Sequence, residues 1–169
     1  MKKIFILFLA FGLAACSTRQ ELPLSSPYLS GNLSLVPKMQ LKSTQDQILY
    51  QEEFTQSGQV LDSFIIDQER LETSLVAYVQ QSFNQLRLAW YQISDEVTQK
   101  KSLKSGSSSQ TLPAILKTFR IVNVFGVKLY AAQYYVDFTD RVQILSYTTD
   151  KLANRKAFIE SVSQLSFTP

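Results

Sequence analysis

Residues 128–138 have the sequence Lys-Leu-Tyr-Ala-Ala-Gln-Tyr-Tyr-Val-Asp-Phe, whose aromatic and branched side chains favour a β-strand. Alternate residues of a strand face opposite sides of a sheet. One side of this strand is aromatic and apolar, and we expect it to be buried. Its members are Tyr130, Ala132, Tyr134, Val136 and Phe138. Tyr135 belongs to the other side, so it either lies under a helix or is exposed.

The runs on both sides of this strand predict an antiparallel meander. Residues 114–122 precede it and residues 141–148 follow it, and both are rich in β-forming residues. The connections at 123–126 and 139–140 have the length of turns, which suits neighbouring antiparallel strands. Residues 114–148 therefore predict three consecutive paired strands.

The remaining elements predict an α+β fold, with an antiparallel β-sheet flanked by two main α-helices. Residues 48–54 and 60–66 are apolar-rich and enclose a Gln-Ser-Gly connection, which is typical of a β-hairpin. Between residues 74 and 88, apolar side chains recur at three- and four-residue steps, which predicts an amphipathic helix. Residues 90–97 predict a strand, and Leu152 to Leu165 predict a second helix before a short terminal strand.

A serine-rich segment at residues 98–110 predicts a flexible, basic loop. It contains Lys100, Lys101 and Lys104, which we consider, together with Tyr135, as possible contacts for a partner protein. A Ser-Lys catalytic pair here would need a buried lysine, and an exposed loop cannot lower a lysine pKa by burial. The loop is therefore interpreted as solvated surface.

The amino terminus has the composition of an export signal. Two lysines precede an apolar run of ten residues, Ile4 to Leu13, which is too short to span a bilayer. The sequence Leu13-Ala14-Ala15-Cys16 that closes this run resembles the bacterial lipobox. That resemblance implies cleavage before Cys16, a diacylglyceryl thioether on its sulfur, and acylation such as palmitate on the new amino terminus. An ordinary secretory signal with an incidental thiol is the alternative.

These features predict three segments. Residues 1–15 are a cleaved lipoprotein signal peptide, residues 16–42 are the lipidated cysteine and a polar tether, and residues 43–169 are a single globular domain. The scattered leucines Leu33, Leu35 and Leu41 offer a different interpretation, in which they form a first strand that lies against the domain. Residue Ser17 is not aspartate, which resembles lipoproteins of the outer membrane facing the periplasm. A Gram-positive cell surface is the alternative location.

The composition restricts the chemistry. The chain has no histidine and a single cysteine, so the commonest general base is absent and lipidation would consume the only thiol. Of the 17 lysines and arginines, two lie in the leader, which leaves 15 basic residues against 14 acidic ones. A nearly neutral chain lacks the charge expected of a nucleic-acid-binding protein. We therefore expect no catalytic residues, no cofactor and no metal site.

Several stretches resemble the PsbP/Mog1-like superfamily and, within it, the DcrB-like bacterial lipoproteins. They are the helix from Thr73 to Leu88, the run Gln133-Tyr134-Tyr135-Val136, the strand from Ile144 to Thr149, and the closing helix with Ser166-Phe167. The resemblance covers roughly residues 47 to 167. It implies an antiparallel sheet flanked by helices, and accessory or binding proteins rather than enzymes.

Taken together, these observations predict a membrane-anchored, non-enzymatic lipoprotein of the cell envelope with an accessory or protein-binding role. Its partners would be the membrane, through the lipid anchor, and an envelope protein. The alternative is a carrier or sensor of a small apolar ligand. A cavity lined by Phe and Tyr would favour the ligand, whereas a filled core with an exposed aromatic patch would favour the partner.

Overall fold

The computed structural model shows an α+β protein, which confirms the predicted class. It describes residues 20–26, 29–35, 39–43, 48–52, 62–89, 92–106, 110–122 and 126–168. The leader, Cys16 and Gly58 lie outside these residues. Within them, the chain forms two helices, which are α1 (Leu75–Ala89) and α2 (Leu152–Val162), and two antiparallel sheets.

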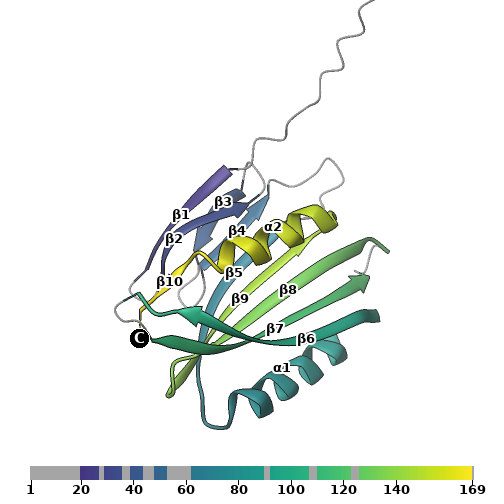
Figure 1. The fold of residues 1–169 in the computed structure, drawn as a ribbon. Helices are drawn as coiled ribbons and strands as arrows, with labels where there is room; N and C mark the ends of the chain where they lie inside the picture. The colour runs from purple at the N-terminus through teal and green to yellow at the C-terminus, as the bar shows by residue number, and fades with distance from the viewer. Residues whose placement is uncertain are drawn as a thin grey trace, which may run out of the picture.

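The larger sheet has seven strands in the order β3-β4-β5-β9-β8-β7-β6 (Figure 1). Every neighbouring pair in it is antiparallel. The strands are β3 (Met39–Ser43), β4 (Ile48–Glu52), β5 (Ser63–Arg70), β6 (Gln92–Lys104), β7 (Thr111–Val122), β8 (Lys128–Asp137) and β9 (Arg141–Thr149). A smaller sheet contains β1 (Gln20–Ser26), β2 (Leu29–Leu35) and β10 (Ser166–Phe167).

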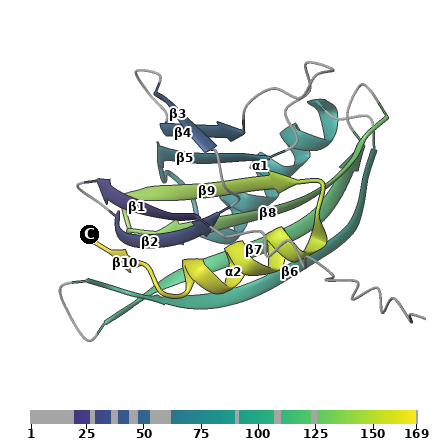
Figure 2. The same ribbon diagram turned by 90° about the horizontal axis from the view of Figure 1, so that it is seen from above.

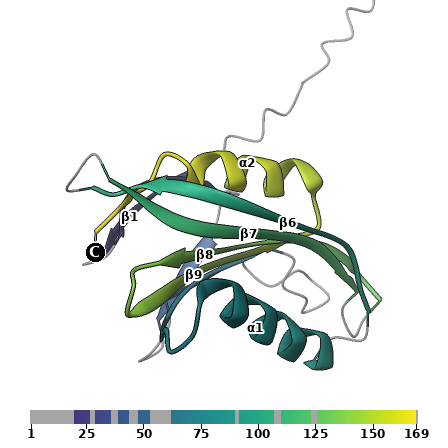
Figure 3. The ribbon, with the colours of Figure 1, turned by 60° about the horizontal axis from the view of Figure 1, so that its bottom comes forward.

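The two helices lie on opposite faces of the large sheet (Figures 2 and 3). On one face, α1 buries Leu75, Val79 and Phe83 against β7, β8 and β9. On the other face, α2 and the small sheet cover a larger core. Its members include Leu29, Leu33, Phe64, Leu116, Tyr134, Leu145, Tyr147, Phe158, Val162, Leu165 and Phe167. Burial on both faces stabilises the sheet without disulfides among the described residues.

The predicted meander is confirmed, because β7 pairs with β8 and β8 with β9 in antiparallel register. The predicted burial of the side of β8 that carries Tyr134 and Val136 is confirmed, and the opposite side is buried as well, which is the first of the two alternatives for Tyr135. Tyr134 and Val136 lie in the core under α2, whereas Leu129 and Tyr135 lie under α1. The central strand of a three-layer arrangement has no solvent-facing side, and a single strand's sequence does not reveal how many layers cover it.

The predicted helix at residues 74–88 is confirmed as α1. The Ser74 hydroxyl accepts a hydrogen bond from the Ala77 amide at 3.3 Å, so Ser74 rather than Thr73 serves as the cap. The hairpin is also confirmed, since β4 pairs antiparallel with β5 from Ile48 to Gln51. The terminal strand is present as β10 and pairs with β2.

Two sequence-based predictions are wrong. Residues 20–26, 29–35 and 39–42 lie in strands rather than in a polar tether, and Leu33 is fully buried, as the alternative interpretation held. Residues 98–104 of the predicted basic loop are instead the second half of β6, whose pairing with β7 continues to Lys104 and Thr111. Residues 107–109 of that loop lie outside the described residues. In both segments, pairing with a neighbouring strand outweighs the weak β-propensity of serine, lysine and glycine.

Tyr134, which is buried under α2, should make the stability of the protein depend on pH. Burial raises the pKa of Tyr134 to about 12, from about 10 in an unfolded chain. The unfolded chain therefore releases this proton first, so the stability that Tyr134 contributes is complete below pH 10 and is lost between pH 10 and 12. We expect the urea midpoint of the wild type to fall over this range.

The matched variant is Tyr134→Phe. It loses the hydrogen bond that the Tyr134 hydroxyl donates to the Ile159 carbonyl at 3.2 Å, which costs about 1 kcal/mol at neutral pH. Above pH 10 its urea midpoint should fall less steeply than that of the wild type. Parallel falls in the two proteins would contradict a raised Tyr134 pKa.

Candidate functional site

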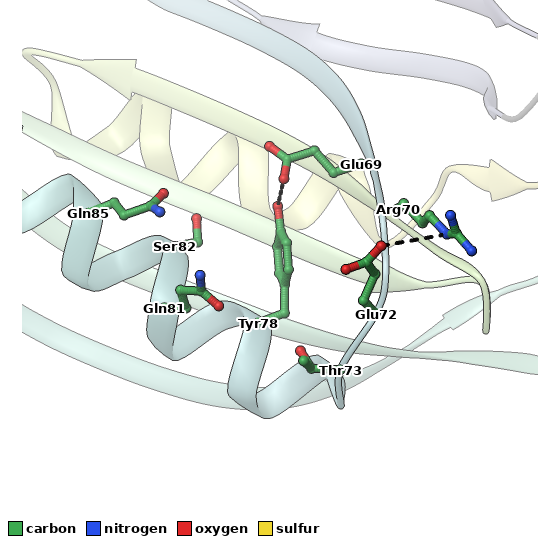
Figure 4. A pocket seen from close by; sticks show the side chains of 8 residues that line it. All are labelled: Glu69, Arg70, Glu72, Thr73, Tyr78, Gln81, Ser82 and Gln85. Atoms are coloured by element: carbon green, nitrogen blue, oxygen red, sulfur yellow. Dashed lines mark hydrogen bonds and ion pairs between the residues drawn. The ribbon is translucent and has the colours of Figure 1, made fainter.

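A polar pocket lies beside α1, where β5 ends and the chain turns into the helix (Figure 4). Its volume is about 460 Å³. The lining residues are Glu69, Arg70, Glu72, Thr73, Tyr78, Gln81, Ser82 and Gln85. The helix supplies Tyr78, Gln81, Ser82 and Gln85 at three- and four-residue steps, which places them along one side of α1.

Tyr78 connects this pocket to the sheet. Its hydroxyl donates a hydrogen bond to the Glu69 carboxylate at 2.6 Å, and its ring meets the edge of the Tyr135 ring at a centroid distance of 6.2 Å. Burial raises the pKa of Tyr78 well above its usual value, and the hydrogen bond to Glu69 adds to that effect. The phenol therefore stays protonated and holds Glu69 in place as a hydrogen-bond acceptor.

Tyr135 forms the floor beneath the helix. Its side chain is 1% exposed, which is the first of the two alternatives that the sequence allowed. Its hydroxyl donates to the Gln133 side-chain oxygen at 2.8 Å, and burial raises the pKa of Tyr135. A partner would not reach this ring in the present conformation, so Tyr135 supports α1 and is removed from the possible contact residues.

The side chains that line this pocket can donate or accept hydrogen bonds. Glu69 and Glu72 supply carboxylates, Arg70 supplies a cation, and the remaining groups are hydroxyls and amides. In the part of the chain that the structure describes, no group of three or more His, Cys, Asp or Glu side chains is placed to hold a metal ion. The arrangement is suited to binding a polar surface or a polar ligand.

A second pocket, of about 400 Å³, lies between the start of α1 and strand β6. Leu75, Val76 and Ile115 provide an apolar floor, and Lys100 and Lys101 are among its other lining residues. Val76 is 60% exposed although it is apolar. Asp137 adds one carboxylate to the lining, so this pocket combines accessible apolar surface with two lysines and one acidic group.

The three predicted contact lysines lie on β6, but they do not share one face. Lys100 pairs in register with Ile115, which is buried under α1, so Lys100 and Lys104 point to the α1 side. Lys101 pairs with Ala114 and points to the α2 side. All three are exposed, and no ion pair joins any of them to a described residue.

A charge cluster beside α1, formed by the buried Lys117 and the more exposed Glu96 and Arg87, was not predicted from the sequence. Lys117 of β7 is 7% exposed, and its Nζ lies 3.8 Å from a Glu96 carboxylate oxygen and 4.0 Å from the centre of the Phe83 ring. Burial lowers the pKa of Lys117, while Glu96 opposes that effect. Arg87 donates to both oxygens of Glu96, at 2.8 and 2.7 Å. The lysine in the middle of an apolar run was the available signal.

The adjacent carboxylates Asp95 and Glu96 point to opposite sides of β6, as expected for neighbours on a strand. Asp95 binds Arg120 at 2.9 Å, whereas Glu96 binds Arg87 of α1 at 2.7 Å. The register between β6 and β7 shifts between Ser94 and Val97, and Asp95 has a φ of 54°. This β-bulge separates the two carboxylates and bends the strand.

We expect that Lys117→Met does not destabilise the protein. Methionine fills a similar volume without a desolvated charge, and Glu96 keeps its two bonds to Arg87. The free energy of unfolding, measured with urea, should be unchanged or rise by about 1 kcal/mol. The control is Arg87→Met, which leaves Glu96 with the more distant lysine and should lower stability. A loss above about 2 kcal/mol in Lys117→Met would contradict the interpretation.

Comparison with known proteins supports the fold alone. No family model matches the chain, and no curated protein matches it. A solved structure, that of PA94 from Pseudomonas aeruginosa, a protein of unknown function, is similar with a TM-score of 0.52 and 14% sequence identity. The match covers 89% of this chain and 98% of that one. It shows that the whole arrangement of sheet and helices recurs in another protein.

Proposed function

We propose that this chain is a lipoprotein of the bacterial cell envelope whose domain binds another envelope protein and does not act as an enzyme. The observation that carries the proposal is the leader that ends in Leu13-Ala14-Ala15-Cys16. We also propose that the domain belongs to the PsbP/Mog1-like, DcrB-like lipoproteins. The antiparallel sheet with α1 and α2 on opposite faces supports this assignment.

The short segment between Cys16 and the first strand limits how far the domain can lie from the membrane. Strand β1 begins at Gln20, four residues after Cys16. Four extended residues reach at most about 14 Å, so a lipid on Cys16 would hold the domain near the bilayer surface. Neither helix in the described part of the chain is long and apolar enough to cross a membrane. The proposed location is the outer membrane facing the periplasm, with a Gram-positive cell surface as the alternative.

The pockets favour a protein partner over a small apolar ligand. The large residues that could line an apolar cavity, such as Phe83, Tyr135 and Phe158, are packed against neighbouring side chains instead. The pocket beside α1 is lined by carboxylates, amides and hydroxyls. Protein surfaces offer matching polar groups, whereas an apolar carrier needs a cavity lined mainly by hydrophobic side chains. Tyr78, the tyrosine that lines this pocket, remains protonated because its pKa is raised, which suits binding rather than proton transfer.

Site-specific photo-crosslinking in the producing bacterium tests this function. A photoreactive phenylalanine analogue replaces Gln85, which is exposed at the polar pocket, or Glu160, which is exposed on α2. We expect one discrete adduct from position 85, none from position 160, and loss of the adduct when Cys16→Ala is added. Equal labelling at both positions, or no adduct at either, would contradict a partner at this pocket.

A further inference from the structure

Among the described residues, strand β6 has one edge without a partner strand along most of its length, and this edge is bounded at both ends. It is the last strand of the seven-stranded sheet, and the only described strand that pairs along it is β7 (Figure 1). At its start the bulge between Ser94 and Val97 bends the strand. At its other end Ser105 bridges to Phe167 of β10, and the Gly106 amide donates to the Phe167 carbonyl. Residues 97–104 therefore form an open window of the edge.

The positive charge of residues 97–104 disfavours pairing of this edge with the same edge of a second copy of the chain. Lys100, Lys101 and Lys104 are exposed and have no ion pair with a described residue. Antiparallel pairing of the window with itself would set lysines opposite lysines, which is unfavourable. Lysines are a known means of protecting sheet edges from self-association. The same charges attract a strand that carries carboxylates.

The pocket beside the window offers room for side chains of an added strand. Lys100 and Ser102 of β6 line it together with the apolar Leu75, Val76 and Pro113. Lys101 and Asp137 also line it, so the lysines outnumber the carboxylate by two to one. A strand added to β6 would direct every second side chain to the α1 side, where this pocket lies. Glutamate or aspartate could pair with the lysines, and a small apolar residue could contact Val76.

We propose that residues 97–104 of β6 are a docking edge for an extended acidic segment of a partner protein, which adds to the sheet as an eighth strand. Main-chain hydrogen bonds would provide the affinity and the three lysines the preference for acidic sequence. The proposal rests on the protein-binding function above and names the class of partner. The docking edge does not depend on the lipid anchor, because all of its residues belong to the folded domain.

The test uses the full chain purified in detergent and a defined probe, the blocked peptide Glu-Val-Glu-Val-Glu-Val-Glu, in calorimetric titration. We expect Lys100→Glu/Lys101→Glu/Lys104→Glu to weaken binding at least about tenfold. The matched control, Lys128→Glu/Lys151→Glu/Lys156→Glu, makes the same charge change at exposed lysines outside β6 and should weaken it less than about threefold. Equal weakening in both variants would overturn the proposal.

A second peptide separates strand addition from simple charge attraction. N-methylation of alternate residues removes amide donors without changing the charge, and should abolish binding if the peptide pairs with an edge. Bound peptide should also slow amide exchange within residues 97–104. Undiminished binding of the methylated peptide, or no binding of the parent peptide at millimolar concentration, would overturn the proposal. Neither result would bear on whether Cys16 carries a lipid, so the proposed anchor and the docking edge are tested separately.

Discussion

Phe158→Ala should cost about 3 to 5 kcal/mol of unfolding free energy, a large fraction of the stability of a single domain. Phe158 is fully buried on α2 at the centre of an aromatic cluster. Its ring stacks on Tyr147 at 5.0 Å and lies 5.6 Å from Phe64 and 6.3 Å from Tyr134. Truncation removes the contacts that join α2 to three strands and leaves a cavity between them.

The control for this prediction is Leu152→Ala on the same helix. Leu152 is 37% exposed, so its truncation should cost less than about 1 kcal/mol. Urea unfolding monitored by circular dichroism gives both values. If Phe158→Ala does not fold, Phe158→Leu provides a graded version with a loss of about 1 to 2 kcal/mol. Equal losses in Phe158→Leu and Leu152→Ala would contradict the central role of this ring.

The elements that sequence reasoning identified are those with a strong local pattern. The three- and four-residue steps from Leu75 to Tyr78 and Val79 identified α1, and the aromatic strand at 128–138 identified the meander. The strands that it missed, β1 to β3 and the second half of β6, contain serine, proline and lysine. Each pairs with the next strand in the chain, β1 with β2, β3 with β4 and β6 with β7. Their residues have weak β-propensity, so only the assembled sheet reveals them.

The candidate site was predicted less completely than the fold. The sequence identified Lys100, Lys101 and Lys104 as exposed cations, but it placed them in a loop and could not show the open edge beside them. Tyr135 was recognised as ambiguous, because burial on its side depends on whether α1 covers it. The polar pocket joins the end of β5 to one side of α1, and no local pattern indicates that these side chains meet.

Cys16→Ala should abolish membrane association of this protein. A thioether-linked diacylglycerol requires the cysteine sulfur, and each buried CH₂ of the acyl chains contributes about 0.8 kcal/mol to membrane binding. Wild type should carry metabolic palmitate label in the membrane fraction, and Cys16→Ala should carry none.

The matched control is Ser17→Ala, which keeps the cysteine and should remain labelled and membrane-bound. Extraction at high salt separates a lipid anchor from charge-based adsorption, since screening weakens only the latter. Persistence of Cys16→Ala in the membrane after such extraction would contradict the anchor. The folded domain would then be better interpreted as a secreted binding protein.

The most direct test of the central claim is the intact mass of the wild-type protein purified from membranes of the producing bacterium. Lipidation of Cys16 predicts a chain that begins at Cys16 and carries the mass of a diacylglyceryl group, with or without a further acyl chain on its amino terminus. A mass equal to that of an unmodified polypeptide, whether it begins at Met1 or after the leader, would contradict it.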